Sequence, residues 1–99
     1  MKIKVLPSAR QDLVDGYKFY EKQSSGLGSY FKDTLFSDID SLSMYGGIHL
    51  VHYGKYYRLL SKRFPFAVYY TIQHDVVCVF AVLDCRRNPA WIRNKLKRK

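Results

Sequence analysis

An unbroken apolar run of eight residues, Val76 to Leu83, constrains this chain most. Successive side chains of a strand point to opposite faces, so a strand of this composition is apolar on both faces and must be covered on both. The run is far shorter than the roughly eighteen residues that a membrane-spanning helix needs. It therefore predicts an interior strand of a sheet, and it argues against a transmembrane span.

Other segments before this run are rich in β-branched and aromatic residues, which favours strands. They are Tyr56–Arg63, Phe66–Ile72 and, as a short extra strand, Ile48–His52. The polar segment Gln73–Asp75 predicts a hairpin turn into the apolar run, and Pro65, which lacks a backbone donor, predicts a bend. Together these segments predict an antiparallel meander.

The first half of the chain has the patterning of a short strand and two helices. Ile3, Val5 and Leu6 indicate a strand that ends at Pro7, and Ser8 with Gln11 has the spacing of a capping box. Two apolar stripes at helical spacing follow: Ala9, Leu13, Tyr17 and Tyr20, then Phe31, Leu35, Ile39 and Leu42. The segment at 24–28, SSGLG, breaks the pattern between them, so we expect a helical hairpin that covers a sheet.

The end of the chain predicts a short helix. Asn88 followed by Pro89 is a typical N-cap and first-turn pair, and the helix should run through Trp91 to about Leu96. We therefore expect one α+β domain over residues 1–99: an N-terminal strand, a helical hairpin packed on an antiparallel meander, and a short C-terminal helix. Residues 94–99 form a basic tail, for which a frayed, solvated end is the alternative.

Charge is distributed unevenly along the chain. The net charge is +9; residues 1–50 hold six basic and six acidic side chains, and residues 51–99 hold eleven basic and two acidic ones. This asymmetry predicts an anionic partner for the second half, with a merely solubilising charge excess as the alternative. The amino terminus lacks the apolar stretch of a secretory signal, so we expect a cytoplasmic protein without a membrane partner.

Common catalytic and metal-binding patterns are not found in the sequence. Cys78 and Cys85 cannot complete a four-ligand zinc site, and no histidine lies at metal-motif spacing from them, so we expect neither a metal nor a cofactor. The acidic residues form no catalytic pair: Asp75 lies in a turn, Asp84 ends a strand, and the rest belong to the helical half. There is also no phosphate-binding glycine loop and no nucleophile motif.

The candidate binding residues are therefore basic and aromatic. Alternation along a strand puts Tyr56, Arg58 and Lys62 on one face, where the cations would hold phosphates and the tyrosine would stack on a base, although Leu60 interrupts that face. An edge strand protected by charge is the alternative. Arginines at a strand end can grip a phosphate bidentately. The full candidate set is Tyr56, Arg58, Lys62, Arg86, Arg87, Trp91 and Arg93.

Three strings in this chain resemble the RelE/ParE toxin superfamily of bacterial type II toxin–antitoxin systems. They are PSARQDLVDGYKFYEKQSSGLGSYF at 7–31, RFPFAVYY at 63–70 and VVCVFAVLDCRRNPAWIR at 76–93. The resemblance covers about residues 3 to 93. It implies a helical hairpin packed on an antiparallel sheet, and a toxin that is neutralised by a small cognate antitoxin with an acidic tail in a hetero-oligomeric complex.

The resemblance leaves two targets open. RelE-like members are metal-independent, ribosome-dependent mRNA endoribonucleases, whereas ParE-like members inhibit DNA gyrase. At the nuclease positions this chain has Arg58, Leu60, Ala67, Arg87 and, where those members have a tyrosine, Arg93. Leucine and alanine transfer no proton, and arginine is a poor base because its pKa stays above about 12. Only Arg58, Arg87 and Arg93 would remain as catalytic residues, so the pattern favours the ParE-like branch, with an inactive or unclassified nucleic-acid-binding member as a further alternative.

Overall fold

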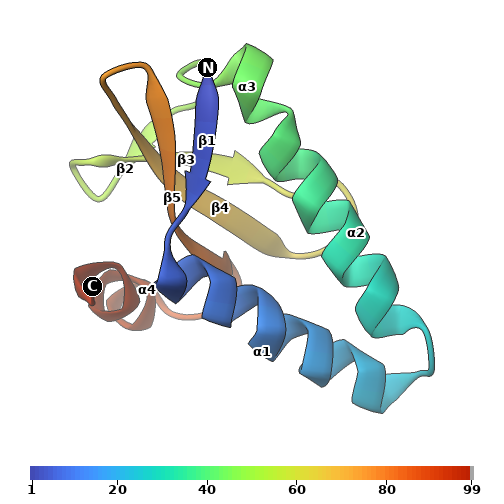
Figure 1. The fold of residues 1–99 in the computed structure, drawn as a ribbon. Coiled ribbons are helices and arrows are strands. Elements are labelled where there is room, and N and C mark those ends of the chain that lie inside the picture. The colour runs from blue at the N-terminus through green and yellow to red at the C-terminus, as the bar shows by residue number, and fades with distance from the viewer. Residues whose placement is uncertain (99) are drawn as a thin grey trace.

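The computed structural model describes residues 1–98, and its element order confirms the expected α+β architecture (Figure 1). The elements are β1 (Lys2–Val5), α1 (Pro7–Gln23), α2 (Leu27–Asp40), α3 (Leu42–Tyr45), β2 (Val51–His52), β3 (Tyr56–Leu60), β4 (Phe66–Gln73), β5 (Val76–Asp84) and α4 (Pro89–Lys97). Within residues 1–98, no helix is long and apolar enough to cross a membrane.

The strands form one sheet in the order β1-β5-β4-β3-β2. Strands β2 to β5 are the antiparallel meander that the sequence predicts. The first strand, β1, pairs in parallel with β5, from Lys2 opposite Val76 to Val5 opposite Val79. The apolar run Val76–Leu83 is therefore an interior strand with a neighbour on each side, as its composition requires.

A β-bulge in β5 turns its side chains over. Tyr69 of β4 lies opposite Ala81 and the next residue, Tyr70, lies opposite Val79, so Phe80 is the extra residue. Before the bulge, Val79 faces the helical hairpin; after it, Ala81 faces α4 on the opposite side. The odd-numbered residues of this run therefore belong to the larger core before the bulge and to the smaller core after it.

The larger core lies between the sheet and the hairpin formed by α1 and α2, which Figure 1 shows on one face of the sheet. The predicted helical stripes supply its buried residues: Ala9, Leu13, Tyr20, Phe31, Leu35, Ile39 and Leu42. Tyr17 of the same stripe is only half-buried. Each helix presents one apolar side to the sheet, so the hairpin and the sheet bury each other's apolar faces.

The turn between the two helices depends on glycine. Gly26 has φ 88°, a left-handed conformation that favours glycine. A Cβ on Gly28 would lie 2.7 Å from the backbone oxygen of Tyr17, so the close approach of α2 to α1 needs a glycine there. The Glu21 carboxylate accepts hydrogen bonds from the backbone N–H groups of Gly26 (3.0 Å) and Gly28 (2.9 Å). These bonds satisfy donors at the start of α2.

The smaller core lies on the opposite face, under α4. Ile92 and Leu96 of α4 pack with Tyr56, Ala67, Tyr69, Ala81 and Leu83. The predicted cap is confirmed: the Asn88 side chain accepts hydrogen bonds from the backbone N–H groups of Ala90 (2.8 Å) and Trp91 (3.1 Å). The cap fixes where α4 begins, and the apolar side of α4 fixes which face of the sheet it covers.

Several of the predicted helix and strand limits are wrong, including that of the short strand expected at Ile48–His52, which is β2 and begins only at Val51. α1 begins at Pro7 with Leu6 as its cap, because proline is preorganised for the first helical position; the Ser8 hydroxyl donates instead to the backbone oxygen of Phe80 (2.7 Å). The second helix, which the apolar stripe predicts from about Ser29 to Leu42, runs instead from Leu27 to Asp40 (α2), and Leu42 begins a separate turn of helix, α3. β3 ends at Leu60, so the predicted extension to Arg63 is a loop that leads into Pro65.

Candidate functional site

Beyond the end of β1, residues at the start of α1 make the hydrogen bonds along the same edge of β5. The Leu6 backbone N–H donates to the backbone oxygen of Val79 (3.0 Å), and the Val82 backbone N–H donates to the Asp12 carboxylate (2.9 Å). Asp12 is 7% exposed and also forms an ion pair with Arg98. Burial raises the pKa of Asp12, and the hydrogen bonds from Val82 and Arg98 oppose that shift. Arg98, assigned to the basic tail, is therefore anchored to α1 rather than frayed.

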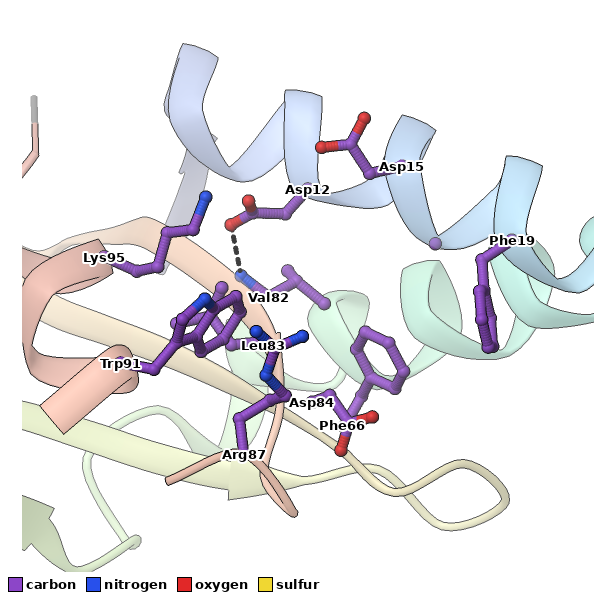
Figure 2. Close-up of a pocket in the computed structure, with 11 residues that line it drawn as sticks. Asp12, Asp15, Phe19, Phe66, Val82, Leu83, Asp84, Arg87, Trp91 and Lys95 are labelled. Carbon is purple, nitrogen blue, oxygen red and sulfur yellow. Dashed lines mark hydrogen bonds between the residues drawn. The ribbon is translucent and has the colours of Figure 1, made fainter. Parts of the chain in front are cut away.

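A groove lies between α1 and α4 (the α1–α4 groove), with a volume of about 270 Å³ (Figure 2). Its lining is Asp12, Asp15, Gly16, Phe19, Phe66, Val82, Leu83, Asp84, Arg87, Trp91 and Lys95. The Arg87 guanidinium lies 4.1 Å from the centroid of the Trp91 ring, and the Lys95 ammonium lies 5.4 Å from it, which are both cation–π distances. Two predicted binding residues, Arg87 and Trp91, therefore share a groove with three carboxylates.

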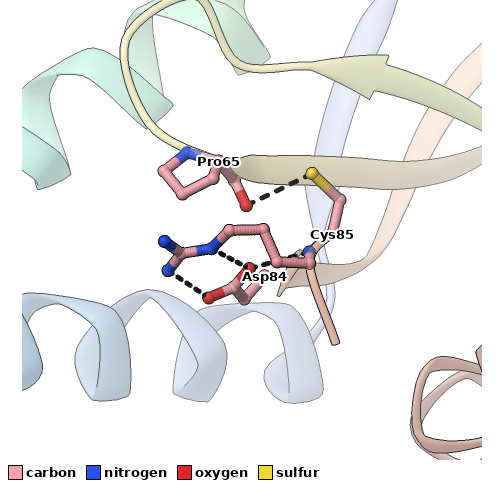
Figure 3. Close-up of polar contacts among 4 residues, drawn as sticks. Pro65, Asp84 and Cys85 are labelled. Atoms are coloured by element: carbon pink, nitrogen blue, oxygen red, sulfur yellow. Dashed lines mark hydrogen bonds and ion pairs between the residues drawn. The ribbon is translucent and has the colours of Figure 1, made fainter. Parts of the chain in front are cut away.

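Arg86 is paired rather than free. Its guanidinium donates to both oxygens of Asp84, at 3.0 and 2.7 Å, and its backbone N–H donates to the same carboxylate at 2.9 Å. These contacts, with the side-chain hydrogen bonds from Arg86 as the largest cause, lower the pKa of Asp84. Next to them, the Cys85 thiol and backbone N–H both donate to the backbone oxygen of Pro65, at 3.3 and 2.9 Å (Figure 3). The contacts tie the loop before β4 to the end of β5.

A second groove, the tyrosine groove, lies beside the other side of α4 and has a volume of about 310 Å³. Its lining is Tyr53, Lys55, Tyr56, Arg93, Leu96 and Lys97. The Arg93 guanidinium lies 5.7 Å from the centroid of the Tyr53 ring, and the Lys55 ammonium lies 5.5 Å from that of Tyr56. The Tyr56 hydroxyl donates to the backbone oxygen of Leu96 (3.1 Å), which fastens α4 to β3. This lining is cationic and aromatic, and no carboxylate of residues 1–98 belongs to it.

Arg58 and Tyr69 lie opposite each other on β3 and β4, on the sheet face that α4 partly covers. The Tyr69 ring is fully buried, and its centroid lies 6.3 Å from that of Tyr53. The Arg58 Nε and the Tyr69 hydroxyl are both buried, and neither has a hydrogen-bond partner within residues 1–98. Burial is the largest cause that raises the pKa of the Tyr69 hydroxyl, whereas the nearby Arg58 lowers it. The hydroxyl is therefore protonated at neutral pH and able to donate.

The predicted binding residues fall into separate places. Tyr56 and Arg93 line the tyrosine groove. Arg58 lies one step away: it is opposite Tyr69, whose ring neighbours that of Tyr53 in the lining. By contrast, Arg87 and Trp91 line the α1–α4 groove and Arg86 is paired with Asp84. Lys62 is exposed in the loop after β3, so the alternation argument does not apply to it.

Sequence reasoning missed three residues of this region: Tyr53, Lys55 and Tyr69. Tyr53 and Gly54 have φ values of 56° and 73°, which form the tight turn between β2 and β3. A tyrosine before a glycine at that turn is a local signal that could have been found. The position of Tyr69 beside Arg58 depends on strand register, which the sequence does not give.

A third groove lies on the outer side of the helical hairpin (the hairpin groove), with a volume of about 270 Å³. Its lining is Arg10, Leu13, Val14, Tyr17, Lys32 and Phe36. Val14 and Phe36 are 41% and 40% exposed, and the Lys32 ammonium lies 5.9 Å from the centroid of the Tyr17 ring. The groove therefore combines an apolar floor with basic residues at its margin.

Comparison with known proteins gives a structural match. No protein-family model matches the sequence, and neither does any curated protein. Among solved structures, a chain of the chromosomal ParDE TA (toxin–antitoxin) system from P. aeruginosa superposes with a TM-score of 0.72; it is 16% identical, and the match covers 83% of this chain and 92% of that chain. This likeness confirms the predicted fold: the chain shares the α+β architecture of that solved chain, a helical hairpin on a mostly antiparallel sheet.

Proposed function

We propose that this chain is the toxin component of a bacterial type II toxin–antitoxin system, that it is ParE-like, and that it inhibits DNA gyrase in the cytoplasm until a cognate antitoxin neutralises it. The observation that carries the proposal is the fold shared with a chain of a ParDE system over 83% of this sequence. The three resembling strings span the same hairpin, β4 and the β5–α4 segment that build that fold.

The positions that differ from the nuclease pattern support gyrase rather than RNA as the target. Leu60 is 51% exposed at the end of β3 and Ala67 is fully buried in β4. Neither side chain moves a proton or stabilises charge, and general acid–base catalysis contributes roughly 10²–10⁴ in rate. Arg87 lies in the α1–α4 groove rather than in the tyrosine groove with Arg93. The basic side chains that a nuclease would need together are thus separated.

The hairpin groove supports the antitoxin part of the proposal. Val14 and Phe36 are partly exposed apolar residues in this groove, and Arg10 and Lys32 belong to the same lining. An amphipathic helix with acidic flanks fits such a surface, because its apolar side covers these apolar residues while its carboxylates meet the basic residues. The net charge of +9 on this chain also favours association with an acidic partner.

A supercoiling assay tests the target. Purified protein added to gyrase at micromolar concentration should block supercoiling or trap cleaved DNA, and the product of the adjacent open reading frame should restore activity. Gyrase that works normally in this assay would refute the proposed target. Induction in cells gives an independent readout, because gyrase inhibition should produce arrest with DNA-damage signalling.

Co-purification tests the antitoxin groove. Val14→Glu together with Phe36→Glu should weaken retention of the tagged adjacent gene product, because two carboxylates replace apolar contacts in a groove that favours acidic partners. Met44→Glu, at a residue that is 77% exposed on α3, is the matched control and should leave retention unchanged. Equal retention by all three proteins would rule out this groove as the docking site.

The second candidate function is ribosome-dependent mRNA cleavage without a metal. It is favoured by one arrangement, the cationic and aromatic lining around Tyr53, Tyr56 and Arg93 with Arg58 close by. In that case primer extension on translated mRNA should show cuts at fixed codon positions that disappear in Arg93→Ala. Rapid translation collapse without DNA-damage signalling would favour this candidate over gyrase inhibition.

A further inference from the structure

One long segment of this chain carries no charge. Residues 41–54, SLSMYGGIHLVHYG, hold no lysine, arginine, aspartate or glutamate, although charged residues make up 25% of the chain. The next longest uncharged stretch, residues 64–74, lies mostly in β4, an interior strand whose side chains are largely buried. Residues 41–54 instead form α3, the loop after it, the edge strand β2 and the turn into β3, and only Leu42 among them is buried.

The same segment holds the most exposed apolar side chains of the protein. Met44, Ile48 and Leu50 are 77%, 72% and 78% exposed, more than any other large apolar side chain of residues 1–98. Tyr45 and Val51 are each more than half exposed. Exposed apolar residues that gather in one segment, rather than lying singly over the surface, are typical of an interaction surface.

β2 is also an open edge of the sheet. It pairs with β3 on one side, and no strand of residues 1–98 pairs with its other side (Figure 1). The Leu50 carbonyl accepts a hydrogen bond from the Arg58 backbone N–H (3.1 Å). Because successive residues of a strand direct their backbone groups to opposite edges, the Val51 N–H and C=O point away from β3 and are available to another strand.

The two edges of the sheet differ in their protection. A free edge invites pairing with another chain, and proteins commonly guard it with lysines. β1 has that protection, because Lys2 and Lys4 are exposed and alternate with its half-buried residues. β2, at the other edge, has exposed Val51 and no charged residue, and the apolar Leu50 precedes it. The edge at β2 is therefore open to strand pairing where the edge at β1 is guarded.

The absence of charge indicates which partner this edge fits. A nucleic acid or an acidic protein segment is attracted by cations, and residues 41–54 offer none. A second copy of this chain also carries +9, so two copies repel each other least where each presents an uncharged surface. Two identical edge strands can meet antiparallel about a twofold axis, and each then supplies the same groups to the other.

We propose that β2 is a self-association edge, at which two copies of this chain pair antiparallel and join their sheets. With the twofold axis at Val51, the N–H and C=O of each Val51 would bond to the C=O and N–H of the other. Leu50 would then lie opposite His52 of the second copy, and its exposed side chain would be covered. The proposal goes beyond gyrase inhibition and antitoxin binding, neither of which requires a pair of copies.

Sedimentation equilibrium of the full chain without its antitoxin tests this edge. The measured mass should rise with protein concentration from that of one chain to that of two. Added salt should preserve or strengthen the dimer, because salt screens the repulsion between two +9 chains. The mass of one chain at every concentration up to the high micromolar range would overturn the proposal. A dimer that salt dissociates would overturn it too, because such a dimer would depend on opposite charges.

Two variants test whether the contact is at β2. Val51→Pro removes the N–H that points away from β3, and Leu50→Lys brings like charges together near the twofold axis, so each should raise the dimer dissociation constant by at least about tenfold. Phe19→Lys is the matched control, because it adds the same charge at an apolar residue of α1 that is 54% exposed, and it should leave the constant unchanged. Circular dichroism melts check that each variant is folded.

A dimer that survives both edge variants would overturn the assignment to β2. A dimer that Phe19→Lys weakens as much as Leu50→Lys does would overturn it as well, because the loss would then reflect total charge rather than position. Supercoiling assays have a separate readout, so failure here leaves the proposed function intact and failure there leaves this edge intact.

Discussion

The buried carboxylate of Asp12 in α1 forms an ion pair with the guanidinium of Arg98, the next-to-last residue of the chain. The same carboxylate accepts the Val82 backbone N–H, so one side chain joins α1, β5 and the end of α4. Arg98 is thus part of the packed structure. A partner that moves the end of α4 would have to break the ion pair between Asp12 and Arg98.

Arg98→Ala should destabilise the protein more than Asp12→Asn at neutral pH. The first change leaves a buried carboxylate without its counterion, which typically costs about 3–5 kcal/mol and here less, because the Arg98 side chain is 27% exposed. The second change removes the charge but keeps an acceptor for the Val82 N–H. Urea unfolding measures both, and the fluorescence of Trp91, the only tryptophan, reports on α4.

The loss of unfolding free energy caused by Arg98→Ala should also be smaller at acidic pH. The pKa of Asp12 is raised in the folded state, so the folded protein binds that proton more readily than the unfolded chain does. Because the folded-state pKa lies above the ordinary value of about 3.9, lowering the pH towards that value protonates Asp12 in the folded protein and removes the charge that Arg98 neutralises. An equal cost at neutral pH and at about pH 4 would contradict this account.

His49 should make stability depend on pH between neutral and mildly acidic conditions. Its Nδ1 lies 2.5 Å from the Tyr70 hydroxyl, which already accepts the Gly47 backbone N–H (2.9 Å) and therefore donates to a neutral imidazole. Burial lowers the pKa of His49, so its contribution is present above the unfolded value of about 6.5 and is lost as the pH falls through and below it. Thermal unfolding across this range should show the loss. His49→Gln should flatten the profile, whereas His74→Gln, in an exposed turn, should leave it unchanged.

Gly16→Ala should destabilise the helical hairpin. A Cβ at this position would lie 2.5 Å from the Phe31 ring, and forcing an extra methyl into a packed core typically costs about 1–3 kcal/mol. Phe31→Leu shortens the side chain that blocks it, so the double variant should lose less than the sum of the two single losses. Chemical denaturation of the four proteins measures this coupling, and strict additivity would show that the two residues do not clash.

Gly54 should tolerate asparagine better than alanine. A Cβ there meets no atom within 4 Å, so the effect of substitution is confined to the backbone, which is left-handed at φ 73°. Alanine in that conformation costs roughly 1–2 kcal/mol, whereas asparagine occupies it more readily. A thermal shift assay distinguishes the two, and equal melting temperatures for both variants would contradict the argument.

The parts of the fold that local chemistry determines were predictable. Asn88 caps α4 because a side-chain acceptor followed by proline satisfies a helix start within three residues. The apolar run at Val76–Leu83 had to be an interior strand, whatever its neighbours. The prediction that Ser8 caps the first helix was wrong because the helix already begins at Pro7. Lys62 lies outside the strand in which it was predicted, because β3 ends at Leu60 and the chain turns before Pro65.

The candidate site was less predictable because it depends on contacts between distant segments. Alternation correctly put Tyr56 and Arg58 on one strand face, but only the register of β3 against β4 brings Tyr69 beside Arg58. The bulge at Phe80 reverses the facing of β5, and no periodicity in the run reveals it. Asp12 and Arg98 are 86 residues apart, and the sequence placed Asp12 only in the helical half of the chain, with no sign of its partner.

The pairing of β1 with β5 has a consequence for synthesis. The first strand to leave the ribosome waits for almost the last one, since Lys2 pairs opposite Val76 and Val5 opposite Val79. Until β5 emerges, the hairpin of α1 and α2 has no complete sheet to cover, and its apolar side stays open to solvent. The sheet is therefore completed only after β5 has been synthesised, and until then a binding partner made alongside this chain would find those apolar surfaces uncovered.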